Sequence, residues 1–163
     1  YSMWGMGAYL SSKVSKTYVV TNKDWDSIDK IILYFVSDFG KENYTLMMVA
    51  KYQKTDSSDR DTYYQAMRDS ISKSLNNYSC SEFSERYRSQ SGYNVNSLGA
   101  KWTSSGNQIY LFVDDLGIMS SSWLKGPLIV YANNSQCSKY LNAVNAYEAD
   151  KKKKTEESVT TEF

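Results

Sequence analysis

Two adjacent aspartates follow a predicted strand, and their position is one at which carboxylates can hold a metal ion. Residues 108–113 are rich in β-branched and aromatic side chains, and Asp114 and Asp115 come directly after them. Carboxylate oxygens at such a position are typical ligands of Mg²⁺. A strand that ends in Asp-Asp is also a common turn, in which aspartate side chains accept backbone hydrogen bonds. We favour the turn, predict no cofactor, and keep Asp114 and Asp115 as weak candidate metal ligands.

Hydrolysis by a pair of carboxylates is the main catalytic alternative. Such a mechanism needs two carboxyl groups facing each other across a cleft. The candidate acids are Glu42, Glu82, Glu85, Asp114 and Asp115, and the sequence alone does not pair them. The chain contains no histidine, which excludes Ser-His-Asp catalysis, Cys-His catalysis and histidine-ligated zinc. We therefore predict that the protein is not an enzyme, with a small carboxylate-dependent hydrolase as an alternative.

Four tryptophans lie in or beside predicted turns and termini. They are Trp4, Trp25, Trp102 and Trp123, and the last two flank serine-rich loops. An exposed indole beside small polar residues is typical of a sugar platform or a protein-binding hot spot. Tryptophan also commonly covers the end of a core. We predict a binding surface that includes these four residues, and a secreted glycan-binding module is the first alternative function.

Cys80 and Cys137 are the two cysteines of the chain. An even number of cysteines in an oxidising compartment favours a disulfide, whereas in a reducing compartment both would be small buried side chains. The first residue is Tyr1 rather than methionine, which is compatible with a removed signal peptide. Tyrosine occurs 15 times, as in many proteins of the cell surface. We predict a Cys80–Cys137 disulfide and an extracytoplasmic location, whether periplasmic, cell-surface or secreted.

The charge pattern argues against nucleic acid as a partner. Lysine and arginine total 19 and aspartate and glutamate 18, so the formal net charge is +1. Nucleic-acid binding normally requires a basic field over one face, because neutralising phosphates supplies most of the affinity. The apolar runs are also too short for a transmembrane helix. The expected partners are therefore proteins, in a homo- or hetero-oligomer, with a glycan as a further candidate.

Several segments have clear secondary-structure signals. Residues 16–22, 44–53, 101–103, 108–113 and 128–132 predict strands, with a hairpin turn over 104–107. Apolar spacing predicts one helix that begins near Ser58 and ends near Leu75, and a second helix from about Gln136 to Lys152 capped by Ser135. Residues 79–90 predict a shorter polar helix.

Residues 24–39 are ambiguous between a helix and a strand. Their apolar side chains recur at i, i+3, i+4, i+7 and i+8, which favours a helix that ends at Gly40. Residues 31–36 are instead β-branched or aromatic almost throughout, as in a buried strand. We favour the helix.

These elements predict an α+β fold in a single domain, with a mostly antiparallel sheet and helices packed on one face. Residues 1–15 form an N-terminal arm, 16–150 the domain, and 151–163 a charged C-terminal tail. The function we expect is a non-catalytic structural or interaction subunit of a larger cell-envelope or extracellular assembly. It would contact its neighbours through Tyr- and Trp-rich surfaces and through both terminal segments.

Overall fold

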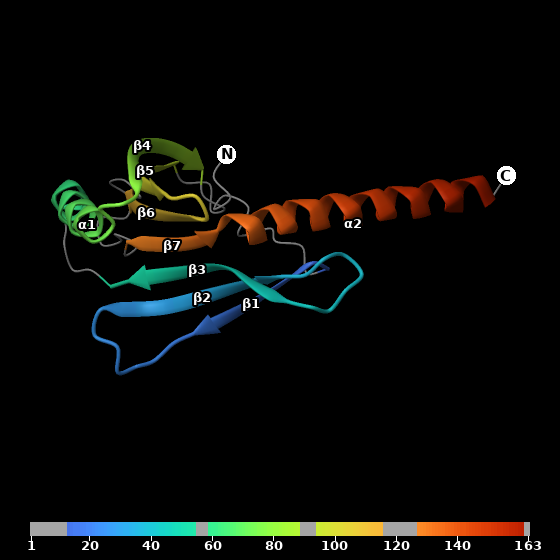
Figure 1. Cartoon of the computed structure of the whole chain (residues 1–163), viewed down its shortest axis with the longest axis horizontal. Helices are drawn as coiled ribbons and strands as arrows, with labels where there is room; N and C mark the ends of the chain where they lie inside the picture. Colours follow the sequence, from blue (N-terminus) through green and yellow to red (C-terminus); the bar gives the residue numbers. More distant parts are fainter. Residues whose placement is uncertain (1–12, 55–58, 89–93, 116–126, 162–163) are drawn as a thin grey trace.

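The computed structural model describes residues 13–54, 59–88, 94–115 and 127–161. Over these residues the chain forms a seven-stranded sheet and two helices (Figure 1). Every strand pairing is antiparallel, which confirms the predicted α+β class. Along the chain the elements are β1 (Ser15–Val20), β2 (Ile28–Val36), β3 (Thr45–Gln53), α1 (Arg60–Ser74), β4 (Ser79–Arg88), β5 (Asn94–Thr103), β6 (Asn107–Asp115), β7 (Leu128–Asn133) and α2 (Asn134–Thr161).

The last strand of the chain occupies the middle of the sheet. The strand order is β1-β2-β3-β7-β6-β5-β4, so β7 pairs with β3 on one side and with β6 on the other. Leu128, Ile129 and Val130 are all buried although consecutive side chains point to opposite faces. A continuous apolar run of this kind is typical of a strand covered on both faces, and the strand predicted over 128–132 is confirmed.

The two helices pack on opposite faces of the sheet, whereas the sequence predicted both on one face. Ile129 belongs to the buried cluster that includes Tyr64 of α1, and its neighbour Val130 belongs to the cluster that includes Tyr140 of α2. Because neighbouring residues of a strand face opposite sides, the two clusters lie on different faces. We call these sides the α1 face and the α2 face. The helix α1 contacts mainly β5 and β6, and α2 contacts mainly β2, β3 and β7.

Two segments predicted as helices are strands. Residues 24–39 contain β2, and residues 79–90 contain β4. In β2 the side chains of Ile31 and Leu33 share one face, and those of Ile32 and Tyr34 share the other. Both faces are apolar, so the spacing also satisfies a helical pattern by coincidence. For β4, the continuous pairing with β5 from Ser79 to Arg88 outweighs a weak and mostly polar helical signal.

The other predicted elements are confirmed, although β5 begins seven residues before the predicted strand at 101 and α2 ends nine residues after the predicted end at 152. Asp59 rather than Ser58 caps α1, because its carboxylate accepts a hydrogen bond from the backbone N–H of Thr62 at 3.0 Å. Asn133 likewise replaces Ser135 as the residue that caps α2, accepting from the N–H of Gln136 at 3.1 Å. A side-chain oxygen at either of two positions one or two residues apart satisfies the same sequence pattern, so the choice depends on the backbone.

The helix α2 continues to Thr161 and extends beyond the sheet (Figure 1). Its residues 151–161 are all exposed, and ion pairs such as Lys154–Asp150 at 3.0 Å connect successive turns. Exposed pairs of this kind contribute about 0.3–0.5 kcal/mol each. The segment predicted as a charged tail is therefore helical up to Thr161. Neither of the described helices has a stretch long and apolar enough to cross a membrane.

Gly99 in β5 allows the close approach of a ring from β4. A Cβ atom placed on Gly99 would lie 2.2 Å from the Phe83 ring and 2.9 Å from the Leu111 carbonyl oxygen. We expect Gly99→Ala to lower the free energy of unfolding by about 1–3 kcal/mol, the usual cost of overpacking. Gly106→Ala is the matched control, because nothing lies within 4 Å of its added Cβ atom. Urea denaturation of both variants measures the effect, and equal stability of the two would contradict it.

Candidate interaction surface

The helix α1 covers only one half of the α1 face of the sheet. Across the other half, the strand registers place Tyr18, Leu33, Val49 and Tyr131 in one row over β1, β2, β3 and β7. Directly opposed residues of antiparallel strands share a face, so this row lies on the same side as Ile109, which packs under α1. No described helix covers the row.

This half of the sheet is apolar and partly open to solvent. We call it the uncovered face and define it by the residues Tyr18, Val20, Ile31, Leu33, Phe35, Leu46, Val49 and Tyr131. Four of these side chains are exposed by 40% or more, namely Tyr18 (53%), Leu46 (44%), Tyr131 (42%) and Val20 (40%). Large contiguous apolar patches on a protein surface commonly mark interaction sites.

Aromatic contacts and two lysines shape the uncovered face. The rings of Tyr18 and Phe35 meet edge to face, with their centres 5.6 Å apart. This contact holds the Tyr18 ring, which lies on the edge strand, against the sheet. Lys16 lies beside Phe35 in the register, and its ammonium group is 4.2 Å from the centre of the Tyr44 ring. Lys51 lies between Ile31 and Ile129 in the neighbouring row. The rows over β1 to β3 therefore combine apolar side chains with positive charge.

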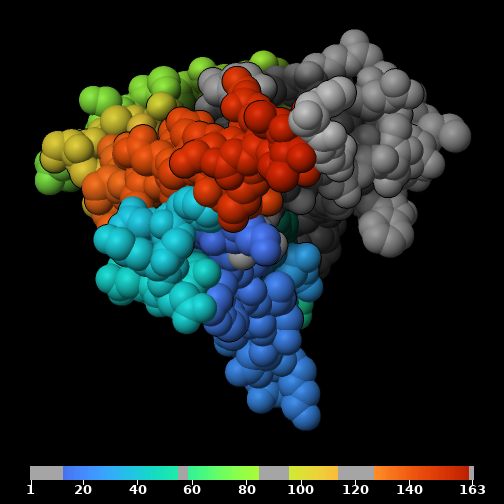
Figure 2. Space-filling model, turned by 90° about the vertical axis from the view of Figure 1, so that its right-hand side faces the viewer, coloured from blue at the N-terminus to red at the C-terminus, as the bar shows by residue number. Residues whose placement is uncertain are grey.

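The uncovered face ends at β1, an edge strand with exposed side chains on both sides. Val19 faces the opposite side from Tyr18 and is 61% exposed. The Ser37 N–H donates to the Val14 carbonyl at 2.9 Å, so the backbone groups of Val14 point toward β2. In an antiparallel pair every second residue bonds to the same neighbouring strand, so the N–H and C=O groups of Thr17 and Val19 point away from β2. Figure 2 shows this end of the sheet, in blue, projecting away from α2. Such an edge is a template for pairing with another strand.

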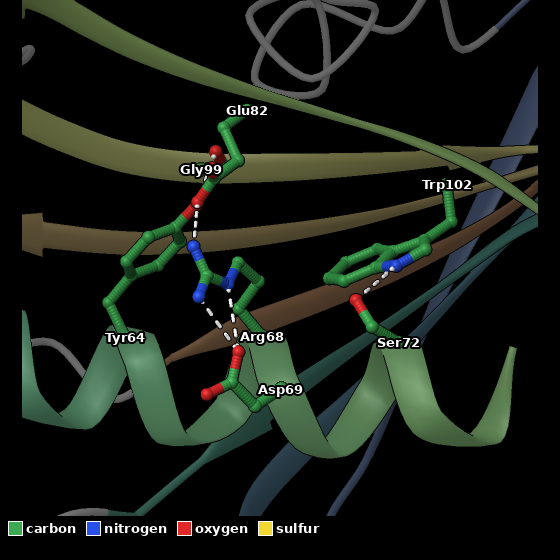
Figure 3. Close-up of polar contacts among 7 residues, drawn as sticks. All are labelled: Tyr64, Arg68, Asp69, Ser72, Glu82, Gly99 and Trp102. Atoms are coloured by element: carbon green, nitrogen blue, oxygen red, sulfur yellow. Dashed lines mark hydrogen bonds and ion pairs between the residues drawn. The ribbon is translucent and has the colours of Figure 1, made fainter. Parts of the chain in front are cut away.

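A polar contact anchors α1 to the opposite end of the sheet (Figure 3). The buried Tyr64 hydroxyl lies 2.8 Å from Glu82 Oε1 and 2.9 Å from the Gly99 carbonyl oxygen. Arg68 donates to the same Glu82 oxygen at 2.7 Å. Burial, followed by the hydrogen bond with Glu82, raises the pKa of Tyr64. These contacts connect α1 to β4 and β5, at the end of the sheet away from β1, and so leave β1 to β3 uncovered by α1 on this face.

The predicted tryptophan surface is wrong for Trp102. Its indole ring is completely buried under α1, and its N–H donates to the Ser72 hydroxyl at 3.0 Å (Figure 3). Trp102 therefore contributes to the core, which is the ordinary role of a tryptophan that has a polar partner. Trp25 is half-buried in the turn before β2, and Trp4 and Trp123 lie outside the described residues.

The structure does not bring the predicted metal ligands into a described site. Asp114 and Asp115 are the last residues of β6, where their backbones pair with Ser97 and Asn96. Their side chains lie outside the described part of the molecule. Among the side chains that the structure does describe, no group of three or more Cys, Asp or Glu is arranged to hold a metal ion.

The predicted disulfide is wrong, because Cys80 and Cys137 lie on opposite sides of the sheet. Cys80 is opposite Trp102 in the register, which places it on the α1 face, and it is exposed. Cys137 is buried between α2 and the α2 face. Both thiols are free. The sequence could not reveal this separation, because it depends on which face each helix covers.

The uncovered face was not identified from the sequence, although one signal was present. In β2, Ile31, Leu33 and Phe35 form one apolar set and Ile32, Tyr34 and Val36 form another. Two apolar sets in one strand indicate that both of its faces require cover. The described structure covers one of them with α2. Because residues 24–39 were predicted to be a helix, the second apolar set did not indicate a second face that requires cover.

No protein-family model matches the chain, and neither the proteins of curated function nor the solved structures contain a significant match to it.

Glu82 makes the stability of the folded chain sensitive to acid. Its pKa is lowered from 4.5, first by the hydrogen bond from Arg68 and then by that from Tyr64. The stability that charged Glu82 contributes is complete above the ordinary pKa and is lost as the pH falls through the lowered one. We expect Glu82→Gln to flatten the decrease in stability between about pH 5 and about pH 3. Urea denaturation across this range measures it.

Arg68→Gln should flatten the same part of the pH profile, because Arg68 is the main cause of the lowered pKa of Glu82. An acid sensitivity in Glu82→Gln equal to that of the wild type would contradict the assignment.

The two thiols should differ strongly in reactivity. Cys80 is exposed, whereas burial raises the pKa of the Cys137 thiol to about 11 and excludes reagents from it. With a thiol-specific reagent such as Ellman's reagent, we expect one thiol to react in the folded protein and the second only after unfolding in denaturant. Cys80→Ser should remove the fast phase and Cys137→Ser the slow one. Two slow thiols, or none after denaturation without reductant, would contradict the structure.

Proposed function

We propose that the protein is a non-catalytic interaction subunit that is built into a larger protein assembly through β1 and the uncovered face. The observation that carries the proposal is an edge strand whose apolar side chains are exposed on both faces of the sheet. Tyr18 and Val20 are exposed on the α1 face, and Val19 is exposed on the α2 face. An edge of this kind, which no other described strand pairs with, otherwise promotes uncontrolled aggregation, so a specific partner that covers it is favoured.

The other edge strand of the sheet has the features of a protected edge. The sequence of β4 is SCSEFSERYR, in which charged and small polar residues dominate. Charged side chains on an edge discourage pairing with other chains. The sequence of β1 is SKTYVV, with one charge, and its register with β2 has no bulge. The contrast supports β1 as the edge that accepts another strand.

The first partner that we propose is a second copy of the chain. If the outward backbone groups of Thr17 pair with those of Val19 in the other copy, a two-fold axis passes beside Tyr18 and brings the two Tyr18 rings together. The two Lys16 side chains then lie at opposite ends of the paired strands, so like charges do not meet. The uncovered faces of the two copies become one continuous apolar surface on which further subunits can pack.

An extracytoplasmic location remains part of the proposal. It rests on the tyrosine-rich composition, because the two free cysteines remove the argument from a disulfide. The terminal segments keep a proposed role as well, and in α2 the exposed helix of residues 151–161 is available for contacts.

Sedimentation velocity over about 1–100 µM tests the pairing by mass action. We expect the wild type to form dimers and larger species as the concentration rises. Val19→Pro should weaken dimer formation at least tenfold, because it removes an N–H that points outward and leaves the hydrogen bonds to β2 intact. Leu46→Lys should leave the dimer and abolish the larger species, because it charges the uncovered face two strands from the edge.

Leu141→Lys is the matched control, because Leu141 on α2 is 43% exposed and Leu46 is 44% exposed. It should assemble like the wild type. A wild type that stays monomeric throughout this range would contradict pairing with a second copy. If Leu141→Lys lowered assembly as much as Leu46→Lys, the uncovered face would lose its assigned role.

A further inference from the structure

A pocket of about 380 Å³ opens on the α1 face, between the chain that leaves α1 and the ends of β3, β6 and β7. This volume lies in the range of small-molecule sites, which is about 300–1,000 Å³. The lining residues that the structure describes are Leu46, Met47, Met48, Val49, Tyr78, Asn107, Gln108, Ile109, Tyr131, Ala132 and Asn133. The pocket therefore adjoins the uncovered face at the side farthest from β1.

Apolar groups and aromatic rings form much of the described lining. Ile109 is almost completely buried and Val49 is partly buried, and because both side chains lie on the α1 face they offer an apolar surface. Tyr78 and Tyr131 add two phenol rings, each with an apolar face and a hydroxyl group. Side chains of this kind bind a ligand that has an apolar face of its own.

Neutral hydrogen-bonding groups supply the polar part of the lining. Asn107 and Asn133 are paired at the start of β6 and the end of β7, and both are exposed. The Asn133 Oδ1 atom accepts hydrogen bonds from the Gln136 N–H at 3.1 Å and the Ser135 hydroxyl at 2.8 Å. These bonds hold the carboxamide in place and leave its NH₂ group as a donor. Gln108 pairs with Ala132 and faces the α2 side, where its Oε1 atom accepts a hydrogen bond from the Tyr110 hydroxyl, so the carboxamides of this pocket are those of Asn107 and Asn133.

The described lining contains no Asp, Glu, Lys or Arg side chain. A charged ligand would lose its hydration on entering the pocket without gaining an opposite charge, so the chemistry disfavours it. A purely apolar ligand would leave the carboxamides and phenols without partners. The lining therefore suits a neutral molecule with one apolar face and several hydroxyl groups around its edge.

We infer that this pocket binds one neutral pyranose residue of a glycan, with its apolar face against a tyrosine ring and its hydroxyl groups on the carboxamides. The pocket lies apart from β1, and its residues Leu46, Val49 and Tyr131 also belong to the uncovered face. It also differs from the tryptophan platform predicted from the sequence, since no tryptophan is among the described lining residues.

The test is an NMR titration of the ¹⁵N-labelled full chain with methyl glycosides of glucose, galactose, mannose and N-acetylglucosamine. A single sugar should bind with a dissociation constant of about 1 mM, which corresponds to about −4 kcal/mol. We expect saturable shifts confined to the lining residues for at least one of the four sugars. Asn107→Ala should weaken that binding about three- to tenfold through loss of a hydrogen bond. Tyr78→Ala should abolish it.

Tyr18→Ala is the control, because Tyr18 is an exposed tyrosine on the same side of the sheet but outside the pocket. It should bind the sugar like the wild type even where it changes assembly, so failure of the pocket and failure of the interface are distinguishable. The inference would be overturned by the absence of saturable shifts with all four sugars up to about 50 mM. Sugar-induced shifts that persist in both Tyr78→Ala and Asn107→Ala would also overturn it, as would binding of indole with no binding of any sugar.

Discussion

The architecture depends on the insertion of β7 between β3 and β6. The strands β1 to β3 and the strands β4 to β6 each pair in chain order, and β7 joins these two groups into one sheet. Leu128 and Val130 pack against the α2 face while Ile129 packs under α1, so a short strand connects both buried clusters. Burial of a large aliphatic side chain contributes about 1.5–3 kcal/mol.

The position of β7 also explains why one part of the sheet stays open. The helix α2 follows β7 directly, so it packs where β7 lies, over the neighbouring strands β3 and β2 on one face. The other helix, α1, is held at the far end by the contacts among Tyr64, Glu82 and Gly99. Two helices on opposite faces of a seven-stranded sheet cannot cover both faces completely. The half left without a described helix is rich in apolar side chains, and this is the basis of the proposal that a partner chain covers it.

Several parts of the fold followed from local chemistry. The run LIVYAN in β7, the hairpin turn before Asn107 and the apolar stripes of both helices are signals that operate within a few residues, and all were predicted correctly. The predictions for β2 and β4 failed because each strand is stabilised by pairing with the adjacent strands of the chain, and the spacing of side chains within one segment does not display that pairing. The candidate interaction surface likewise depends on packing between segments, which local signals do not display. Trp102 was expected at the surface, and only the placement of α1 over β5 shows that it is buried.

The sequence by itself determined the α+β class, most strands, both long helices and the exclusion of histidine-dependent chemistry. These properties depend on residue type and on spacing of two or three to four residues, which a sequence displays directly. The tertiary structure alone decided the face that each helix covers, the separation of Cys80 from Cys137, and the existence of the uncovered face and its pocket. Each of these depends on the strand order, and strand order is set by packing between residues that are distant along the chain.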